Sequence, residues 1–178
     1  MPVPHSAAAL LPLALLPVLA PPPATVVEAD FDRGGAFVLP TAVSYAADLV
    51  PYGSHIRVTE QRTDTGTAVT VSVRGLAPGL RLAAHVHTGR CGADPAVAGP
   101  HYQDRPDPVQ PSTDPAYAND RNEARLALRT DARGAAAGRT DLAWAFRAGE
   151  ARSLVLHTSA QAGGHPAGER IACVSADF

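Results

Sequence analysis

Apolar and polar residues alternate along several short stretches of the chain, which is the pattern of β-strands with one buried face. In residues 54–62 and 67–74, Ile56, Val58 and three further valines recur at every second position. The Asp-Thr-Gly segment at 64–66 between the two stretches is a turn signal and predicts a hairpin. Six other stretches have strand character: 41–47, 80–88, 123–130, 137–146, 152–158 and 170–175.

The eight predicted strands are separated by turns, and no segment predicts a convincing helix. The 17 prolines and 15 glycines favour short strands joined by many turns. Hydrophobic residues make up 46% of the 178 residues, which is enough for the core of one domain. The expected fold class is therefore all-β, with an eight-stranded antiparallel barrel or sandwich.

The charge balance excludes one class of partner. The formal net charge is −2, and all 15 basic residues are arginines, which stay charged at any working pH. Nucleic-acid-binding domains usually carry a clear basic excess, which this chain lacks. We therefore expect no nucleic-acid partner, and the residues give no indication of an oligomeric state.

The amino terminus has features of an export signal. Residues 7–20 form an apolar run that is shorter than the roughly 20 residues of a membrane-spanning helix, and two prolines interrupt it. We expect a signal peptide over residues 1–24, no stable membrane span, and an exported protein that is secreted, periplasmic or held in the cell envelope. A disordered proline-rich tail is the alternative.

The boundary between leader and domain is predicted from small and flexible residues. Ala24 and Ala29 each precede a candidate cleavage point. A proline cluster, an acidic stretch and two adjacent glycines follow the apolar run, so residues 25–39 are expected to be a linker. The domain is then expected at 40–178.

The two cysteines agree with export. Cys91 and Cys173 are 82 positions apart, and a disulfide closing so long a loop stabilises by about 4–5 kcal/mol on the chain-entropy model. Behind an export signal a disulfide is the favoured interpretation. Two buried free thiols are the alternative.

Four of the seven histidines stand in positions that suit a metal site. His85 and His87 are two apart on a predicted strand, so both imidazoles point to the same face and can reach one ion. His101 opens a long loop after Gly-Pro, and His157 ends a later strand. An H-x-H pair alone is a weak signal. No role is assigned to the other three histidines, His5, His55 and His165.

The order of these motifs resembles the copper/zinc superoxide dismutase family. The chain contains H-V-H at 85–87, a cysteine at 91, G-P-H at 99–101, L-V-L-H at 154–157 and R-I-A-C at 170–173. The resemblance extends over residues 40–178. It implies an eight-stranded Greek-key β-barrel, which agrees with the strand count reached from the pattern.

The resemblance also implies roles for individual residues. His85, His87, His101 and His157 match the four copper ligands, and imidazoles suit both Cu(II) and Cu(I). Cys91 and Cys173 match the intrasubunit disulfide. Arg170 matches the active-site arginine that guides the anion toward copper. His101 matches the bridging histidine, which is protonated during the catalytic cycle of zinc-containing members.

The chain departs from the family at the zinc site. Between His101 and Glu123 it has no other histidine, and the aspartates of that loop are expected to be solvated. We therefore expect copper without zinc, as in the copper-only branch that the chain resembles. Glu123 is predicted to hold the His101 ring through a hydrogen bond, the alternative being a solvated glutamate at a strand start. The aspartates concerned are Asp104, Asp107, Asp114 and Asp120.

The expected function is that of an exported, copper-dependent superoxide dismutase, which converts superoxide to dioxygen and hydrogen peroxide. The loop 159–169 is short and carries few charges, so the copper is expected to be open to solvent, with Arg170 as the main nearby cation. The alternative is a copper-binding or copper-delivery protein on the same fold. Arg170 favours the enzyme because metal storage has no need of an anion guide.

Overall fold

The computed structural model describes residues 24–35 and 38–178. The signal peptide expected over residues 1–24 lies outside the described residues except for Ala24. The described chain consists of β-strands and loops with one short 3-10 helix, η1 (Pro95–Ala98). None of the described residues belong to a helix with the length and apolarity needed to cross a membrane.

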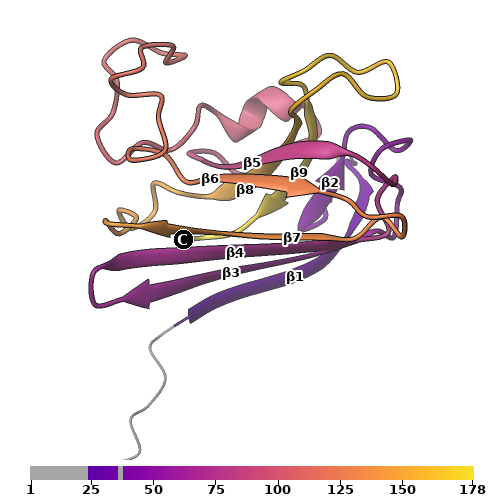
Figure 1. Cartoon of the computed structure of the whole chain (residues 1–178), viewed down its shortest axis with the longest axis horizontal. Coiled ribbons are helices and arrows are strands. Elements are labelled where there is room, and N and C mark those ends of the chain that lie inside the picture. Colours follow the sequence, from indigo (N-terminus) through magenta and orange to yellow (C-terminus); the bar gives the residue numbers. More distant parts are fainter. Residues whose placement is uncertain (1–23, 36–37) are drawn as a thin grey trace, which may run out of the picture.

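Nine strands pair in the order β6-β5-β8-β9-β2-β1-β3-β4-β7 and fold into two facing layers (Figure 1). One layer contains β1, β3, β4 and β7, and the other contains the remaining five strands. The end strands β6 and β7 lie next to each other, so the sheet nearly closes into a barrel. The strands are β1 (Ala24–Arg33), β2 (Ala42–Ser44), β3 (His55–Thr63), β4 (Gly66–Arg74), β5 (Arg81–His87), β6 (Arg125–Arg129), β7 (Ala136–Leu142), β8 (Ser153–Thr158) and β9 (Arg170–Ser175).

The β3–β4 hairpin shows how the apolar alternation leads to this fold. Ile56 lies opposite Val73 and Val58 lies opposite Val71, and all four side chains are buried between the layers. Residues between them, such as Arg57, face solvent. The hairpin predicted from the sequence is therefore confirmed.

The linker expected at 25–39 is wrong for its first part, because residues 24–33 form strand β1. β1 pairs antiparallel with β3 and parallel with β2, so residues 24–33 belong to the sheet and not to a linker. Only Phe31 of this strand is fully buried, and the small side chains before it are half-buried at best, which made the alternation weak. The all-β barrel is confirmed, with nine strands in place of eight and one parallel pair.

The strand predicted over 137–146 ends earlier than expected. β7 stops at Leu142, and the chain then leaves the sheet. Trp144 and Phe146 pack instead on Tyr102, with ring centroids 5.8 and 5.2 Å from it. Aromatic side chains that resemble the end of a strand thus anchor the loop that follows His101 to the open end of the barrel.

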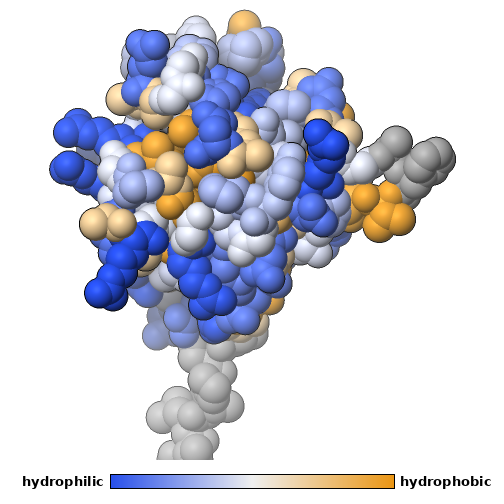
Figure 2. All heavy atoms as spheres, turned by 90° about the vertical axis from the view of Figure 1, so that its right-hand side faces the viewer, coloured by the Kyte–Doolittle hydropathy of each residue, from blue (hydrophilic) through white to orange (hydrophobic). Residues whose placement is uncertain are grey.

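The outer surface is mainly hydrophilic on the face shown in Figure 2, with hydrophobic residues scattered over it. Val38 and Val109 are the most exposed of the large hydrophobic side chains among the described residues, at 81% and 71%. Both lie in loops and not in a strand. Most large apolar side chains of the strands are buried, with Val26 of β1 as an exposed exception, and the candidate functional histidines lie on the outer face of the second layer.

Candidate metal centre

Two neighbouring strands and one loop position the four histidines. Leu82, Ala84 and Val86 of β5 point into the core, so His85 and His87 point to the opposite face. β8 pairs with β5 and places His157 beside Ala83 on that same face. His101 comes from the loop after η1 and forms an isolated bridge with His87.

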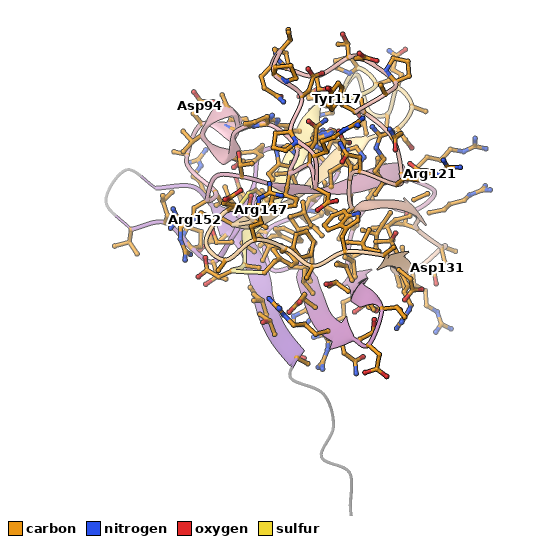
Figure 3. All side chains as sticks on the ribbon, turned by 90° about the vertical axis from the view of Figure 1, so that its left-hand side faces the viewer. Asp94, Tyr117, Arg121, Asp131, Arg147 and Arg152 are labelled. Carbon is orange, nitrogen blue, oxygen red and sulfur yellow. A yellow bond between two sulfur atoms is a disulfide. The ribbon has the colours of Figure 1, made fainter. Side chains whose placement is uncertain are left out.

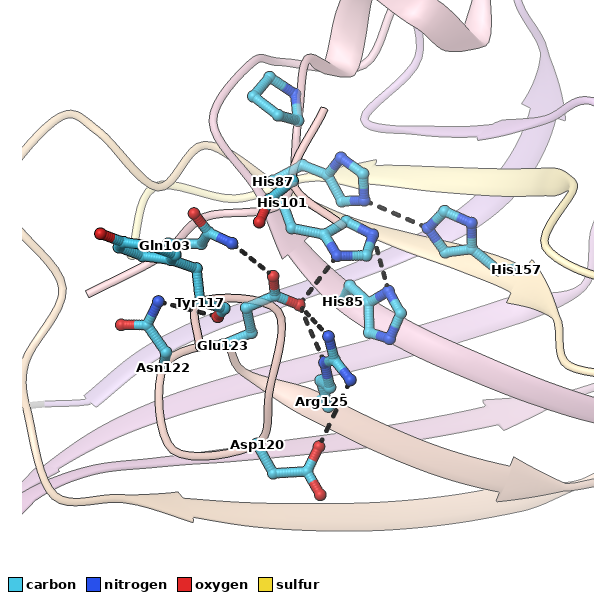
Figure 4. A network of polar contacts seen from close by, with 12 residues as sticks. His85, His87, His101, Gln103, Tyr117, Asp120, Asn122, Glu123, Arg125 and His157 are labelled. Atoms are coloured by element: carbon cyan, nitrogen blue, oxygen red, sulfur yellow. Dashed lines mark hydrogen bonds and ion pairs between the residues drawn. The ribbon is translucent and has the colours of Figure 1, made fainter. Parts of the chain in front are cut away.

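The four imidazoles converge on one point (Figure 4). One ring nitrogen of each histidine lies within 4.8 Å of the corresponding nitrogen of the others. His85 Nδ1 is 2.9 Å from His101 Nε2, and His87 Nε2 is 3.2 Å from His157 Nε2. Nitrogen ligands lie about 2 Å from a bound metal, so one ion between these atoms is compatible with the arrangement.

Backbone carbonyls hold two of the rings. His87 Nδ1 donates to Gly99 O at 3.0 Å, and His157 Nδ1 donates to Gly168 O at 3.1 Å. A carbonyl oxygen can only accept, so each Nδ1 carries the proton and each Nε2 keeps its lone pair. Gly99 has φ of +72°, and a Cβ there would lie 2.7 Å from Thr88 Oγ1. Glycine is therefore needed where the chain presents this carbonyl to His87.

Burial keeps three of the histidines neutral. Because burial penalises the charged imidazolium, the pKa falls to about 3 for His85, about 2 for His87 and about 4 for His157. Repulsion from His101 adds to this effect at all three positions. At neutral pH these rings are therefore in the form that binds a metal ion.

Glu123 lies against His101, at the position that the sequence analysis assigned to it. His101 Nδ1 donates to Glu123 Oε2 at 3.0 Å, and Gln103 Nε2 donates to Oε1 at 2.8 Å. Arg125 Nε donates to Oε2 at 2.9 Å. Burial alone would raise the pKa of Glu123, but hydrogen bonds from these three donors lower it to about 2. The carboxylate is thus ionised although only 1% of the residue is exposed.

Arg170 stands beside the histidines. Its Nη1 donates to Pro95 O at 2.8 Å, and its Nη2 donates to Gly99 O at 2.7 Å, the same carbonyl that holds His87. A cavity of about 110 Å³ is lined by Arg170 together with His101 and Glu123. Arg170 also lines a larger, open cavity of about 930 Å³. The guanidinium is therefore accessible and lies at the approach to the histidine cluster.

The disulfide between Cys91 and Cys173 is confirmed, with 5.7 Å between the two Cα atoms. It joins the start of the long loop to β9, three residues after Arg170. Val43, Ala98 and Val155 pack around it in a small core of their own. The alternative of two free thiols is wrong.

Sequence reasoning missed Arg125 and Gln103, each two residues from a residue that it did identify. The spacing between Glu123 and Arg125 could have identified Arg125. Glu123 lies two residues before β6 begins at Arg125, and side chains two positions apart on an extended chain point to the same face. The expectation of a solvated Asp107 is wrong: its carboxylate is buried and accepts from Val109 N and Ser112 Oγ. None of the loop aspartates joins the histidine cluster among the described residues.

Two other histidines lie apart from the cluster. His55 Nδ1 is 2.8 Å from an Asp30 oxygen on the neighbouring strand. His165 lies between Glu169 and Asp48, with both distances 3.1 Å. These ion pairs raise the pKa of His165. His5 lies outside the described residues.

Comparison with known proteins agrees with this geometry. Residues 53–175 match the copper/zinc superoxide dismutase family. The fold is similar to that of a Cu/Zn superoxide dismutase from Brucella abortus, with a TM-score of 0.50 and 18% sequence identity over 84% of this chain and 98% of that one. No curated protein sequence matches the chain significantly. The family match spans both histidine-bearing strands and both cysteines, and the chain belongs to the copper/zinc superoxide dismutase family.

Proposed function

We propose that the protein is an exported, copper-dependent superoxide dismutase that works without zinc. The observation that carries the proposal is the convergence of four imidazole nitrogens beside an accessible arginine. Membership of the family supports the reaction class. The disulfide and the apolar amino-terminal run support export, because disulfides persist in oxidising compartments.

The donor set fits copper. Four imidazoles supply nitrogen ligands that serve both oxidation states, with no carboxylate or thiolate among them. When bound, copper would supply one-electron redox chemistry, by which two superoxide ions and two protons would be converted to dioxygen and hydrogen peroxide. The residues that hold it are His85, His87, His101 and His157.

Arg170 binds and orients the anion in this proposal. A guanidinium has five N–H groups, and the two contacts to Pro95 and Gly99 leave donors free for a small anion. Its charge is permanent, so the approach to the cluster stays attractive to superoxide at any working pH. The carbonyl of Gly99 fixes Arg170 and His87 together, which sets the anion site relative to the ligands.

His101 and Glu123 explain how the site can do without zinc. The His101 ring is held by a carboxylate through its Nδ1–H, which leaves Nε2 directed at the other histidines. A carboxylate that accepts from a ligand histidine fixes its orientation and basicity. Among the described residues, the four histidines are the single group that offers a set of metal ligands.

Metal analysis of the mature protein alongside a superoxide-consumption assay tests the proposal. We expect one copper per chain, no stoichiometric zinc, and dismutation that depends on copper. His87→Ala should lose copper and most activity, whereas His55→Ala, far from the cluster, should keep both. Tightly held zinc in equal amount to copper would overturn the zinc-free assignment.

Arg170→Glu separates the enzyme from the copper carrier. The four ligands stay in place, so copper content should be kept, while the second-order rate of superoxide consumption should fall by about tenfold or more. The same charge change at Arg139, exposed on the opposite layer, is the control and should change the rate little. A copper-loaded wild type without dismutase activity would favour the carrier.

A further inference from the structure

Arg125 links a permanent cation to one of the candidate metal ligands. It is the first residue of β6 and lies directly across from His85 of β5. Its Nε and Nη2 are 2.9 and 2.8 Å from Glu123 Oε2, and that same oxygen accepts the proton of His101 Nδ1 at 3.0 Å (Figure 4). One carboxylate oxygen thus joins the guanidinium to the ring of His101.

The contact matters because Glu123 is buried. A carboxylate removed from water is costly unless it is paired and hydrogen-bonded. Its donors are Gln103, His101 and Arg125, and of these Arg125 brings a permanent positive charge. The Glu123 side chain is 2% exposed, against 31% for Arg125, so the charge reaches the buried carboxylate from the solvent side.

The other partner of Arg125 does not account for its position. Asp120 Oδ1 is 3.7 Å from Arg125 Nη1, and the Asp120 side chain is 88% exposed. Exposed pairs of this kind contribute little to stability. The two close contacts both go to Glu123, and they use the planar fork that arginine has and lysine lacks.

We propose that Arg125 is a positioning residue for the candidate metal centre. Its guanidinium fixes the Glu123 carboxylate in the orientation that receives the Nδ1–H of His101, and this keeps the His101 Nε2 lone pair directed at the other three histidines. The inference rests on the proposed function only in that the four histidines bind copper. It assigns Arg125 no contact with copper or superoxide.

The direct test observes the Nδ1–H proton of the His101 ring in the metal-free protein. Nitrogen-15 NMR of the imidazoles should show a protected His101 Nδ1–H in wild type, which Arg125→Gln should lose through exchange with water. Arg129→Gln is the matched control, because Arg129 is on the same strand and face but pairs with Arg81 at its exposed end. That variant should keep the signal.

Copper binding gives a second readout. Competition with a chelator should show a fall in Cu(II) affinity of about tenfold or more for Arg125→Gln, the size typical for loss of a partner that orients a ligand. The electron paramagnetic resonance spectrum of the Cu(II) form should change as well. Arg125→Lys should restore part of the affinity, since it returns the charge without the fork. Arg129→Gln should match wild type in both measurements.

A double-mutant cycle shows whether Arg125 acts through Glu123. In a Glu123→Gln background, Arg125→Gln should lower the Cu(II) affinity by less than twofold, because its target is already gone. An equal fall in both backgrounds would overturn the proposal, as would an unchanged Nδ1–H signal and affinity in Arg125→Gln. If Arg125→Gln does not fold, Arg125→Lys serves as the test. A Cu(II) affinity and an electron paramagnetic resonance spectrum identical to those of wild type would then refute the need for the guanidinium fork of Arg125.

These readouts do not depend on turnover. If wild type binds copper through the histidines but fails to consume superoxide, the proposed function is wrong while the role of Arg125 stands. If the dismutase activity is present and the Arg125 variants behave as wild type in NMR and copper affinity, the role of Arg125 is wrong while the proposed function stands.

Discussion

The two loops that border the histidine cluster differ in how many of their residues are buried and in what holds them to the barrel. The loop that precedes β6 is anchored from within, since Tyr102, Gln103, Asp107 and Asn122 are buried. The loop at 159–169 has no buried residue of its own; buried His157 and Thr158 of β8 bond to its last residues, and the ion pairs of His165 hold its exposed side. The long loop is therefore held by buried residues of its own, whereas the loop at 159–169 is held by buried residues of β8 at its end and by exposed ion pairs elsewhere.

The anchoring of the long loop extends to its tip. The guanidinium of Arg105 lies 4.6 Å from the centroid of the Tyr117 ring, and Asn122 Nδ2 donates to the backbone oxygens of both residues. Figure 3 shows Tyr117 among the side chains of this loop, above the barrel. Arg147 adds bonds from below, donating to the backbone of Asp104. This loop is polar in composition, and hydrogen bonds within it and to the rest of the chain nevertheless hold it in place.

Among the predicted effects on the stability of these loops, removal of the disulfide should have the largest. The paired variant Cys91→Ser/Cys173→Ser should lower the free energy of unfolding by about 2–5 kcal/mol, because the cross-link closes a long segment and pins the start of the long loop to β9. Urea denaturation of wild type and variant measures this. A loss below about 1 kcal/mol would show that the buried polar contacts hold the loop without it.

Asn122→Ala should produce the next largest effect. Its side chain also accepts from Arg105 N at 2.7 Å, so the change leaves the backbone N–H and C=O of Arg105 without partners, while Tyr117 O still accepts from Asn119 N. We expect a loss of about 1–3 kcal/mol, measured by the same unfolding experiment. Asn119→Ala is the control, because Asn119 is only partly buried and its two side-chain bonds to the backbone are exposed to solvent, so their loss should cost much less. Equal losses would contradict the distinction between buried and exposed anchors.

Much of this structure could be predicted from the sequence, for reasons that are local. The β3–β4 hairpin follows from strict alternation, and the four histidines and two cysteines follow from motif order. β1 could not, because its inward side chains are small and its burial depends on neighbours far along the chain. Arg125 was missed and Asp107 was assigned to solvent although their partners lie within five positions, because the pattern of residues does not show the loop conformation that brings these groups together.

The smallest predicted effect is a pH dependence of stability that comes from His165 in the loop at 159–169. Pairing with Glu169 and Asp48 raises the pKa of His165, so its stabilising contribution is complete below about pH 6.5, the ordinary value, and is lost as pH rises through the raised pKa. His165→Gln should remove this pH dependence and lower stability at pH 5.5 by less than about 1 kcal/mol, as exposed pairs are screened by solvent. Proton NMR titration of the His165 imidazole measures its pKa, and a value at or below 6.5 would contradict stabilisation by the ion pairs with Glu169 and Asp48.

The place of β9 has a consequence for the disulfide and for Arg170. β9 is the last strand of the chain, yet it lies between β8 and β2 inside the second layer. The β3–β4 hairpin joins strands that are adjacent in sequence, whereas β2 pairs with residues 172–174, far along the chain. The cross-link to Cys173 and the placement of Arg170 also belong to this strand. The Cys91–Cys173 bond and the placement of Arg170 therefore both depend on the pairing of one strand, β9, with β8 and β2.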